Sequence, residues 1–236
     1  MWPAGILAAR SEQTEVLDGP MPPEERAAEL RDIDRLNAWF AGYALSLRHV
    51  AARLGASPSR GRRTVVDVGG GGARFAVRLT RWAWGRGHDV RVIVVERDDD
   101  ALAVARTVSL RNPGIMLVQA DAHQLPFRTG GVDLVTSTLL LHHLPSTEVA
   151  ACLREMRRAA RVGVIVNDLL RTPLALLLVW VGTRLFASSR AARVDGPLSV
   201  RRAYSETELR GLASEAGLTE LTVHRYPWVA RLIAVA

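Results

Sequence analysis

Lysine is absent from this chain of 236 residues, and all 31 of its basic side chains are arginine. P-loop nucleotide hydrolases, pyridoxal phosphate enzymes and protein kinases all need a lysine at the centre of their chemistry. The sequence therefore excludes these three classes. Arginine outnumbers the 24 acidic residues and gives a net charge of +7, but the arginines are scattered along the chain. We interpret this bias as codon usage and expect no nucleic-acid partner.

Cysteine and long apolar runs are also scarce. The single cysteine, Cys152, allows no internal disulfide and fits a reducing interior. The first residues, Met1 to Ala4, show no basic segment followed by a long apolar run, so we expect no secretory signal and a cytoplasmic location. The apolar stretch Pro173–Val181 is far shorter than the roughly 20 residues of a membrane span. It predicts a buried or lid helix without stable membrane insertion.

Short apolar runs alternate with helical patterns from residue 61 onward, in a chain that is 48% hydrophobic. Runs that are apolar on both faces and separated by helices predict a parallel sheet covered on both sides. The expected strands are Thr64–Val68, Val90–Val95, Ile115–Gln119, Val132–Thr136 and Val162–Val166. The expected helices are Ala73–Trp84, Asp99–Leu110, Thr147–Arg158 and Glu206–Ala216.

The N-terminal quarter follows a different pattern. Residues 1–20 lack periodicity, and we expect them to be mobile. From Pro22 to Leu54, apolar side chains recur at spacings of three and four, which predicts helix, and the stretch 55–61 predicts a linker. We therefore expect an N-terminal helical cap or lid over residues 1–60. The core would span residues 61–236 and contain a lid insertion near residues 171–203.

The segment from Val65 to Ala73 reads as a strand, four glycines and the start of a helix. Glycines allow a sharp turn and a close approach of the backbone to a ligand, and the helix start presents free N–H groups. Many nucleotide-binding folds share such a loop, so the loop alone does not identify its ligand. Asp67 narrows the choice, because a carboxylate before the glycines favours a ligand with an ammonium group over a pyrophosphate.

Two further acids follow the next two strands. Glu96 ends one strand, where a carboxylate can accept hydrogen bonds from both hydroxyls of a ribose. Asp121 follows the other and lies within reach of an adenine amino group. The carboxyl ends of parallel strands meet at one edge of a sheet, so we expect both acids to face the same crevice as Asp67. The alternative is that each acid caps a strand end or a helix.

Together these segments resemble the cofactor-binding motifs of class I S-adenosylmethionine (SAM) dependent methyltransferases. The glycine segment is similar to motif I, Glu96 to the acid that binds the ribose, and Asp121 with Ala122 to the pair that reads the adenine. The segment 133–145 resembles the fourth-strand motif of the small-molecule members of this family. The resemblance covers residues 60–170, about half of the chain.

This resemblance implies an α/β fold: a Rossmann-like, doubly wound, mostly parallel seven-stranded sheet with an N-terminal helical cap. It also implies SAM as the cofactor. One departure is Ala73, where the family often has a third glycine. The residues expected to bind the cofactor are Asp67, Gly69, Gly70, Gly71, Glu96, Arg97, Asp121 and Ala122.

The sequence also suggests groups that would face the methyl acceptor. His142 and His143 follow the fourth strand and Asp168 follows the fifth, so all three open onto the same crevice. A histidine oriented by a carboxylate suits a base for a phenol or enol, and we predict these three residues as catalytic. The alternative is that one histidine caps or packs against the next helix, near Ser146. Adjacent histidines do not readily chelate one ion and Cys152 has no partner cysteine, so we expect no metal.

Trp39 and Trp180 lie in the expected cap and lid, where they would suit an aromatic or lipophilic acceptor, although core packing explains them equally well. We predict methyl transfer to a small aromatic, quinone-like or polyketide-type acceptor of secondary metabolism, through oxygen or carbon, by a monomer or homodimer. The alternatives are a SAM-binding protein without transfer activity, an NAD-dependent oxidoreductase and a nucleic-acid methyltransferase. A Tyr-x-x-x-Lys pair cannot exist here, which opposes the second alternative. Residues 135–139 lack an Asn/Asp-Pro-Pro-Tyr/Phe pattern, which opposes the third.

Overall fold

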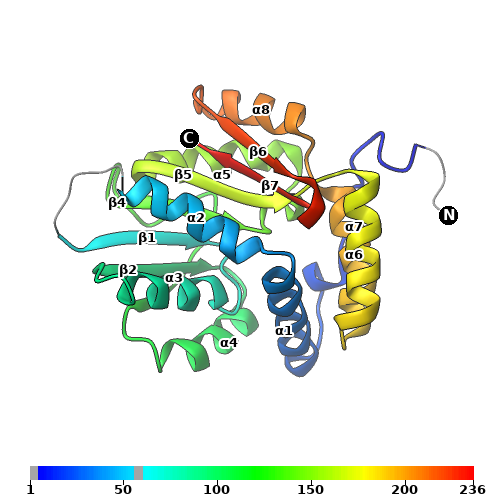
Figure 1. Cartoon of the computed structure of the whole chain (residues 1–236), viewed down its shortest axis with the longest axis horizontal. Helices are drawn as coiled ribbons and strands as arrows, with labels where there is room; N and C mark the ends of the chain where they lie inside the picture. The colour runs from blue at the N-terminus through cyan, green and yellow to red at the C-terminus, as the bar shows by residue number, and fades with distance from the viewer. Residues whose placement is uncertain (1–4, 56–60) are drawn as a thin grey trace.

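A seven-stranded sheet forms the centre of the computed structural model, which describes residues 5–55 and 61–236 (Figure 1). Its strand order is β3-β2-β1-β4-β5-β7-β6. Strand β7 runs antiparallel to both of its neighbours, and every other pair is parallel. The predicted doubly wound, mostly parallel sheet is therefore confirmed. The strands are β1 (Arg63–Val68), β2 (Val90–Glu96), β3 (Ile115–Gln119), β4 (Val132–Thr138), β5 (Ala160–Leu169), β6 (Thr222–Tyr226) and β7 (Arg231–Val235).

Helices cover both faces of this sheet. Alternate side chains of β1 point to opposite faces, so Val65 joins one buried apolar cluster while Val66 joins the other. The cluster with Val65 receives side chains from α2, α3 and α4, and the cluster with Val66 from α5 and α8. These helices are α2 (Gly42–Gly55), α3 (Arg74–Trp84), α4 (Asp99–Ser109), α5 (Ser146–Ala159) and α8 (Glu206–Glu215).

The helical pattern predicted from Pro22 to Leu54 is broken in the middle. It forms α1 (Pro23–Trp39) and α2, and Ala41 between them has a left-handed backbone with φ of +53°. Alanine rarely adopts this conformation, so the break could not be predicted from the sequence. Most of the predicted linker at 55–61 and the first four residues, on which the absence of a secretory signal was argued, lie outside the described residues.

The N-terminal segment 5–20, here called the strap, is not the mobile arm that we expected. The Arg10 guanidinium donates hydrogen bonds to backbone carbonyls, including that of His142 at 2.9 Å. The short 3-10 helix η1 (Val16–Asp18) is held by Asp195, which accepts two of its backbone N–H groups at 2.9 Å. The strap therefore packs against distant parts of the chain.

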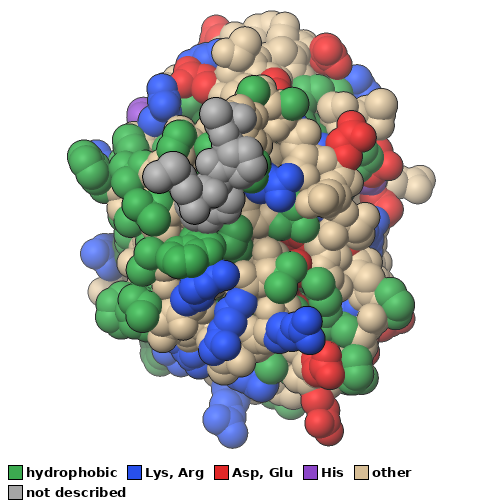
Figure 2. All heavy atoms as spheres, turned by 90° about the vertical axis from the view of Figure 1, so that its right-hand side faces the viewer, with side chains coloured by type: hydrophobic (Ala, Val, Ile, Leu, Met, Phe, Trp, Pro, Cys, Tyr) green, Lys and Arg blue, Asp and Glu red, His purple; other side chains and the backbone are tan. Residues whose placement is uncertain are grey.

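Helices α6 (Pro173–Phe186) and α7 (Arg190–Arg202) pack against each other and against α1 at the carboxyl ends of the parallel strands (Figure 1). Helix α6 is the predicted lid helix, whereas α7 was not predicted. The face of the molecule formed there combines apolar and arginine side chains (Figure 2). Among the described residues, no helix has the length and apolar character that crossing a membrane requires.

Candidate active site

The glycine turn after β1 leaves no room for side chains. Gly69 has a φ of +65°, and a Cβ built there would lie 2.7 Å from Cδ1 of Leu140. A Cβ on Gly70 would lie 2.8 Å from Oδ2 of Asp67. Ala73, where the family often has glycine, also has a left-handed backbone with φ of +60°. Ala73 therefore adopts the backbone conformation that a glycine would adopt, at a strain of about 1–2 kcal/mol.

Asp67 lies beneath this turn with only 1% of its surface exposed. Its Oδ1 accepts a hydrogen bond of 3.3 Å from the hydroxyl of Thr136 on the neighbouring strand β4. Burial raises the pKa of Asp67 to about 7, and the hydrogen bond from Thr136 opposes this only in part. The carboxyl thus titrates near neutral pH, where a cationic ligand would favour its charged form.

Glu96 at the end of β2 is tied to the glycine turn. Its Oε2 accepts a hydrogen bond of 3.0 Å from the backbone N–H of Gly71. Its Oε1 accepts the N–H groups of Arg97 and Asp98 at 2.8 and 3.0 Å. Each carboxylate oxygen can accept more than one hydrogen bond, so these contacts orient Glu96 and leave acceptor capacity for ribose hydroxyls.

Asp121 is fixed by its neighbour His123. One carboxylate oxygen of Asp121 accepts the backbone N–H of His123 at 2.8 Å and lies 2.5 Å from Nδ1 of its ring. The backbone hydrogen bond is the main reason why the pKa of Asp121 is lowered, and the His123 ring adds to the effect. His123 lines the same cavity as Asp121.

One cavity of about 300 Å³ brings the predicted cofactor residues together. Its glycine floor, which Cβ atoms would fill, and the carboxylates around it fit an adenosine that carries a charged amino acid. Trp39 and Trp180 are not among the residues that line it, whereas three other aromatic residues, Phe40, Tyr43 and Phe75, are. Trp39 instead stacks on Phe186 with ring centroids 4.7 Å apart. The cofactor residues in the lining are Asp67, Gly69, Gly70, Gly71, Glu96, Arg97, Asp121 and Ala122.

His142 and Asp168 form a buried pair beside this cavity. His142 lies on the 3-10 helix η2 (Leu141–His143), and its Nδ1 is 2.6 Å from Oδ1 of Asp168. The other carboxylate oxygen accepts the backbone N–H of His142 at 3.1 Å. Asp168 lies within β5, not after it. It is not among the residues that line the cavity, so it contacts His142 on the side of the ring away from the cavity. Burial alone would raise the pKa of Asp168, but the charge and hydrogen bond of His142 lower it.

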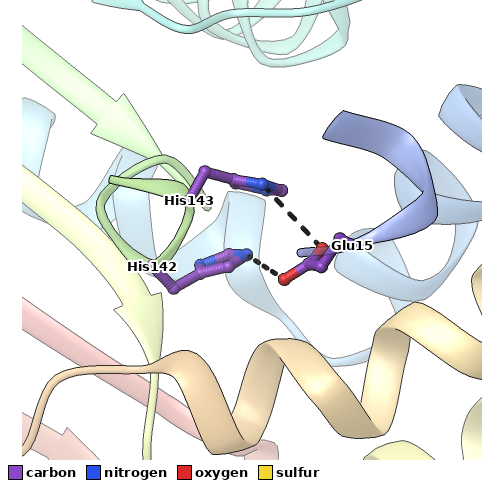
Figure 3. A group of neighbouring side chains, drawn as sticks. All are labelled: Glu15, His142 and His143. Atoms are coloured by element: carbon purple, nitrogen blue, oxygen red, sulfur yellow. Dashed lines mark ion pairs between the residues drawn. The ribbon is translucent and has the colours of Figure 1, made fainter. Parts of the chain in front are cut away.

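His143 faces the strap. Its Nδ1 lies 2.8 Å from Oδ1 of Asp18. Between the two histidines lies the carboxylate of Glu15, with Oε1 3.9 Å from Nε2 of His142 and Oε2 3.9 Å from Nδ1 of His143 (Figure 3). Burial raises the pKa of Glu15 to about 7. Neither Glu15 nor Asp18 was predicted, because the strap shows no periodicity that would place it at the site.

Other charged residues of the cavity were missed as well, among them Glu29 and Arg231. Glu29 of α1 is 1% exposed, and neither of its carboxylate oxygens has a hydrogen-bond partner among the described residues. Burial, reinforced by nearby Asp195, raises the pKa of Glu29 to about 8. Arg231 of β7 donates to Asn37 at 2.9 Å, while its Nε and Nη1 lack partners in the described part of the chain. In the sequence both look like ordinary helix and strand residues.

Comparison with known proteins points to the family that the motifs suggested. Residues 65–163 match the family model of a methyltransferase domain. The chain is 30% identical to a demethylmenaquinone methyltransferase of Roseiflexus sp. (strain RS-1), over 62% of each chain. It is 29% identical to the demethylmenaquinone methyltransferase of Roseiflexus castenholzii, over 86% of this chain and 90% of the relative. The match thus spans about three fifths of one relative and nine tenths of the other.

Solved structures show the same fold at low sequence identity. The CurJ carbon methyltransferase has a TM-score of 0.66 at 12% identity, covering 92% of this chain and 61% of the other. Magnesium protoporphyrin IX methyltransferase of Synechocystis PCC 6803 with bound S-adenosylhomocysteine has a TM-score of 0.56 at 18% identity, covering 83% of each chain. Together with the domain match, these likenesses favour the methyltransferase interpretation over an NAD-dependent oxidoreductase. Residues 65–163 therefore form a domain similar to those of SAM-dependent methyltransferases, with SAM as the cofactor.

Proposed function

We propose that this protein transfers the methyl group of SAM to a hydroxylated, quinone-like or other aromatic small molecule, at oxygen or at carbon. The observation that carries this proposal is the His142–Asp168 pair at the wall of the cofactor cavity. Asp168 holds Nδ1 of His142 and thereby leaves Nε2 at the wall of the cavity, 3.9 Å from the carboxylate of Glu15 and without a hydrogen bond to any described residue. In that orientation the imidazole takes the proton of an acceptor hydroxyl.

The charge around the cavity supports an acceptor that bears oxygen. Deprotonation of a phenol or enol leaves an oxyanion, and Arg231 has two N–H donors without partners among the described residues. Its buried guanidinium lines the same cavity as His142. A phenolate is nucleophilic at its oxygen and at the adjacent ring carbon, so this arrangement serves either site of methylation.

The names of the relatives support the acceptor class. Besides the Roseiflexus proteins, several matches are named ubiquinone/menaquinone biosynthesis C-methyltransferase, among them one from Vibrio vulnificus at 32% identity over 45% of this chain. A quinol carries hydroxyls on an aromatic ring, which is the chemistry that His142 and Arg231 would recognise. We therefore place quinols and related polyphenols first among the acceptors, with polyketide-type enols second.

The test is a panel of reduced naphthoquinones, resorcinols and β-dicarbonyl compounds incubated with SAM, with S-adenosylhomocysteine release as the readout. Mass spectrometry of the product then distinguishes O- from C-methylation. His142→Gln should lower kcat by about 10²–10⁴-fold, the usual contribution of a general base, and should change the SAM affinity by less than about threefold. His88→Gln alters an exposed histidine and should leave both quantities unchanged.

Two results would contradict the proposal. If SAM binds but no acceptor yields S-adenosylhomocysteine above the blank, the alternative of a SAM-binding protein without transfer activity is the better description. If a true acceptor is found and His142→Gln turns over at the wild-type rate, the pair has no part in the reaction.

A further inference from the structure

The carboxylate of Glu15 and the rings of His142 and His143 converge on one point at the wall of the cavity (Figure 3). One ligand atom from each lies within 4.8 Å of the others. The sequence argument against a metal was that adjacent histidines do not readily chelate one ion and that Cys152 has no partner cysteine. Here the two rings lie side by side instead, with centroids 4.3 Å apart and planes tilted by 35°. The strap then brings a carboxylate against both.

The carboxylate of Glu15 is the second sign that something binds there. The side chain is 2% exposed, and its Oε1 has no hydrogen-bond partner among the described residues. An unpaired buried carboxylate costs several kcal/mol of desolvation, unless a cation or hydrogen-bond donor occupies the space beside it. The nearest cation is Arg202, whose Nε is 3.5 Å from Oε1.

Arg202 uses its hydrogen bonds elsewhere, and in doing so holds the group in place. Its guanidinium donates to the backbone carbonyls of His142 at 3.0 Å, His143 at 2.8 Å and Gln13 at 2.6 Å. The strap and η2 are therefore fixed to each other through one side chain. Such fixed backbones keep Glu15 and the two histidines in register, as a preorganised site requires.

Each histidine is also oriented by a carboxylate of its own. Asp168 holds Nδ1 of His142, which leaves Nε2 directed at Glu15. Asp18 lies 2.8 Å from Nδ1 of His143, the nitrogen that faces Glu15. A carboxylate on the ring nitrogen away from the ion, as Asp168 is for His142, commonly orients a metal-binding histidine and raises its basicity. Nδ1 of His143 would exchange its contact with Asp18 for the ion. Asp18 is also close enough to offer a further oxygen to an ion beside His143.

The local charge suits a divalent cation. Glu15, Asp18 and Asp168 are three acids around the two imidazoles, and Arg202 offsets one of their charges. Two imidazoles and one carboxylate are the ligand set of transition metals such as Zn²⁺, whereas Mg²⁺ and Ca²⁺ prefer oxygen alone. Ligands about 2.0–2.1 Å from a tetrahedral ion lie roughly 3.3 Å apart. The three ligand atoms lie within 4.8 Å of one another, so binding an ion requires them to close by up to about 1.5 Å.

We propose that Glu15, His142 and His143 form a binding site for one divalent transition-metal ion, of which Zn²⁺ is the first to test. Three protein ligands leave coordination positions open toward the cavity. The role of the ion rests on the proposed function: an open position would hold the hydroxyl oxygen of the acceptor and favour release of its proton to water. With Nε2 bound to the ion, His142 would be a ligand and the ion would replace it in activating the hydroxyl. The binding site itself does not depend on that function.

The experiment is a calorimetric titration of the full chain with Zn²⁺ after removal of metals by a chelator. We expect one ion per chain, with the affinity lowered at least tenfold in Glu15→Gln and in His143→Asn. His143 is less buried than Glu15, so His143→Asn provides the test if Glu15→Gln does not fold. Both variants should keep the SAM affinity of the wild type within about threefold, which separates loss of the ion from loss of the cofactor site.

His224→Asn is the matched control. The rings of His49 and His224 lie 4.7 Å apart, and neither forms an ion pair with a carboxylate in the described part of the chain. This pair offers Zn²⁺ two imidazoles without an acid, and its loss should leave the affinity unchanged. The proposal fails if the wild type binds no Zn²⁺, or if the affinity depends on His224 and not on Glu15. If the wild type binds Zn²⁺ but transfers no methyl group, the proposed function is refuted and the proposed metal site still holds.

Discussion

At the scale of single residues, the buried carboxyl of Asp67 makes stability depend on pH. Its pKa is raised from an ordinary value near 4 to about 7 in the folded protein. Between these values the unfolded chain releases the proton and the folded chain keeps it, so stability falls as the pH rises from 4 to 7. Asp67→Asn removes this dependence. Relative to wild type, the free energy of unfolding of this variant should rise from pH 4 to pH 7, by on the order of 4 kcal/mol at most. Urea unfolding at each pH measures the difference.

The pKa values of Glu15 and Glu29 are also raised, but they are raised in both proteins. Their contribution therefore cancels when the stabilities of wild type and variant are subtracted. A gap between wild type and Asp67→Asn that stays constant from pH 4 to 7 would show that this carboxyl is not perturbed. Adding SAM should narrow the gap above pH 7 if the ammonium group of the cofactor pairs with the charged form of Asp67.

The residues that the sequence could predict are those that share a short motif. Asp67 and Glu96 lie near the ends of recognisable strands and Asp121 follows one, and strand ends converge in a parallel sheet. Glu15 and Arg231 reach the same cavity from opposite ends of the chain. No local pattern predicts their position, because it depends on how the strap packs against distant parts of the chain and on where β7 lies in the sheet.

At the scale of elements, the packing of α6 against α7 depends on a glycine. A Cβ built on Gly196 would lie 2.5 Å from Cγ2 of the buried Thr183 and 3.2 Å from Cγ1 of Val179. We expect Gly196→Ala to destabilise the protein by about 1–2 kcal/mol, because the crowding outweighs the roughly 1 kcal/mol that alanine gains in a helix. Thermal or urea unfolding measures the difference.

Gly211 in α8 is the comparison for that substitution. Nothing lies within 4 Å of a Cβ built there, so Gly211→Ala should stabilise by about 0.5–1 kcal/mol. Equal effects of the two substitutions would mean that α6 and α7 do not approach as closely as described.

The elements that the sequence predicted well are the apolar strands and the amphipathic helices around them. Helix α7 was missed because Gly196 and Pro197 lie inside it, and both residues favour helix ends. The break at Ala41 was missed for the opposite reason, since alanine favours helix. In both places the packing of α1, α6 and α7 overrides the local preference.

At the scale of the whole molecule, the cofactor should raise the unfolding temperature. A ligand at about 100 times its Kd stabilises the folded state by about 2.7 kcal/mol. For a chain of this size we expect a shift of roughly 5–10 °C with SAM and none with NAD, measured by calorimetry or dye-free fluorescence. Glu96→Ala should abolish most of the shift, because Glu96 orients the glycine turn and would bind the ribose. A shift with NAD that equals the shift with SAM would contradict the cofactor assignment.

Residues from two different regions of the chain line the cavity: the matched domain and the strap outside it. The residues predicted to bind the cofactor lie inside the matched domain, residues 65–163, whereas Glu15, Asp18 and Arg202 lie in the flanks of the chain. Mutations in the flanks can therefore reshape the wall that meets the acceptor and leave the hold on SAM intact. Proteins that share this domain can diverge in what they methylate through their two ends alone, and a chimera that exchanges those ends should exchange acceptor preference with them.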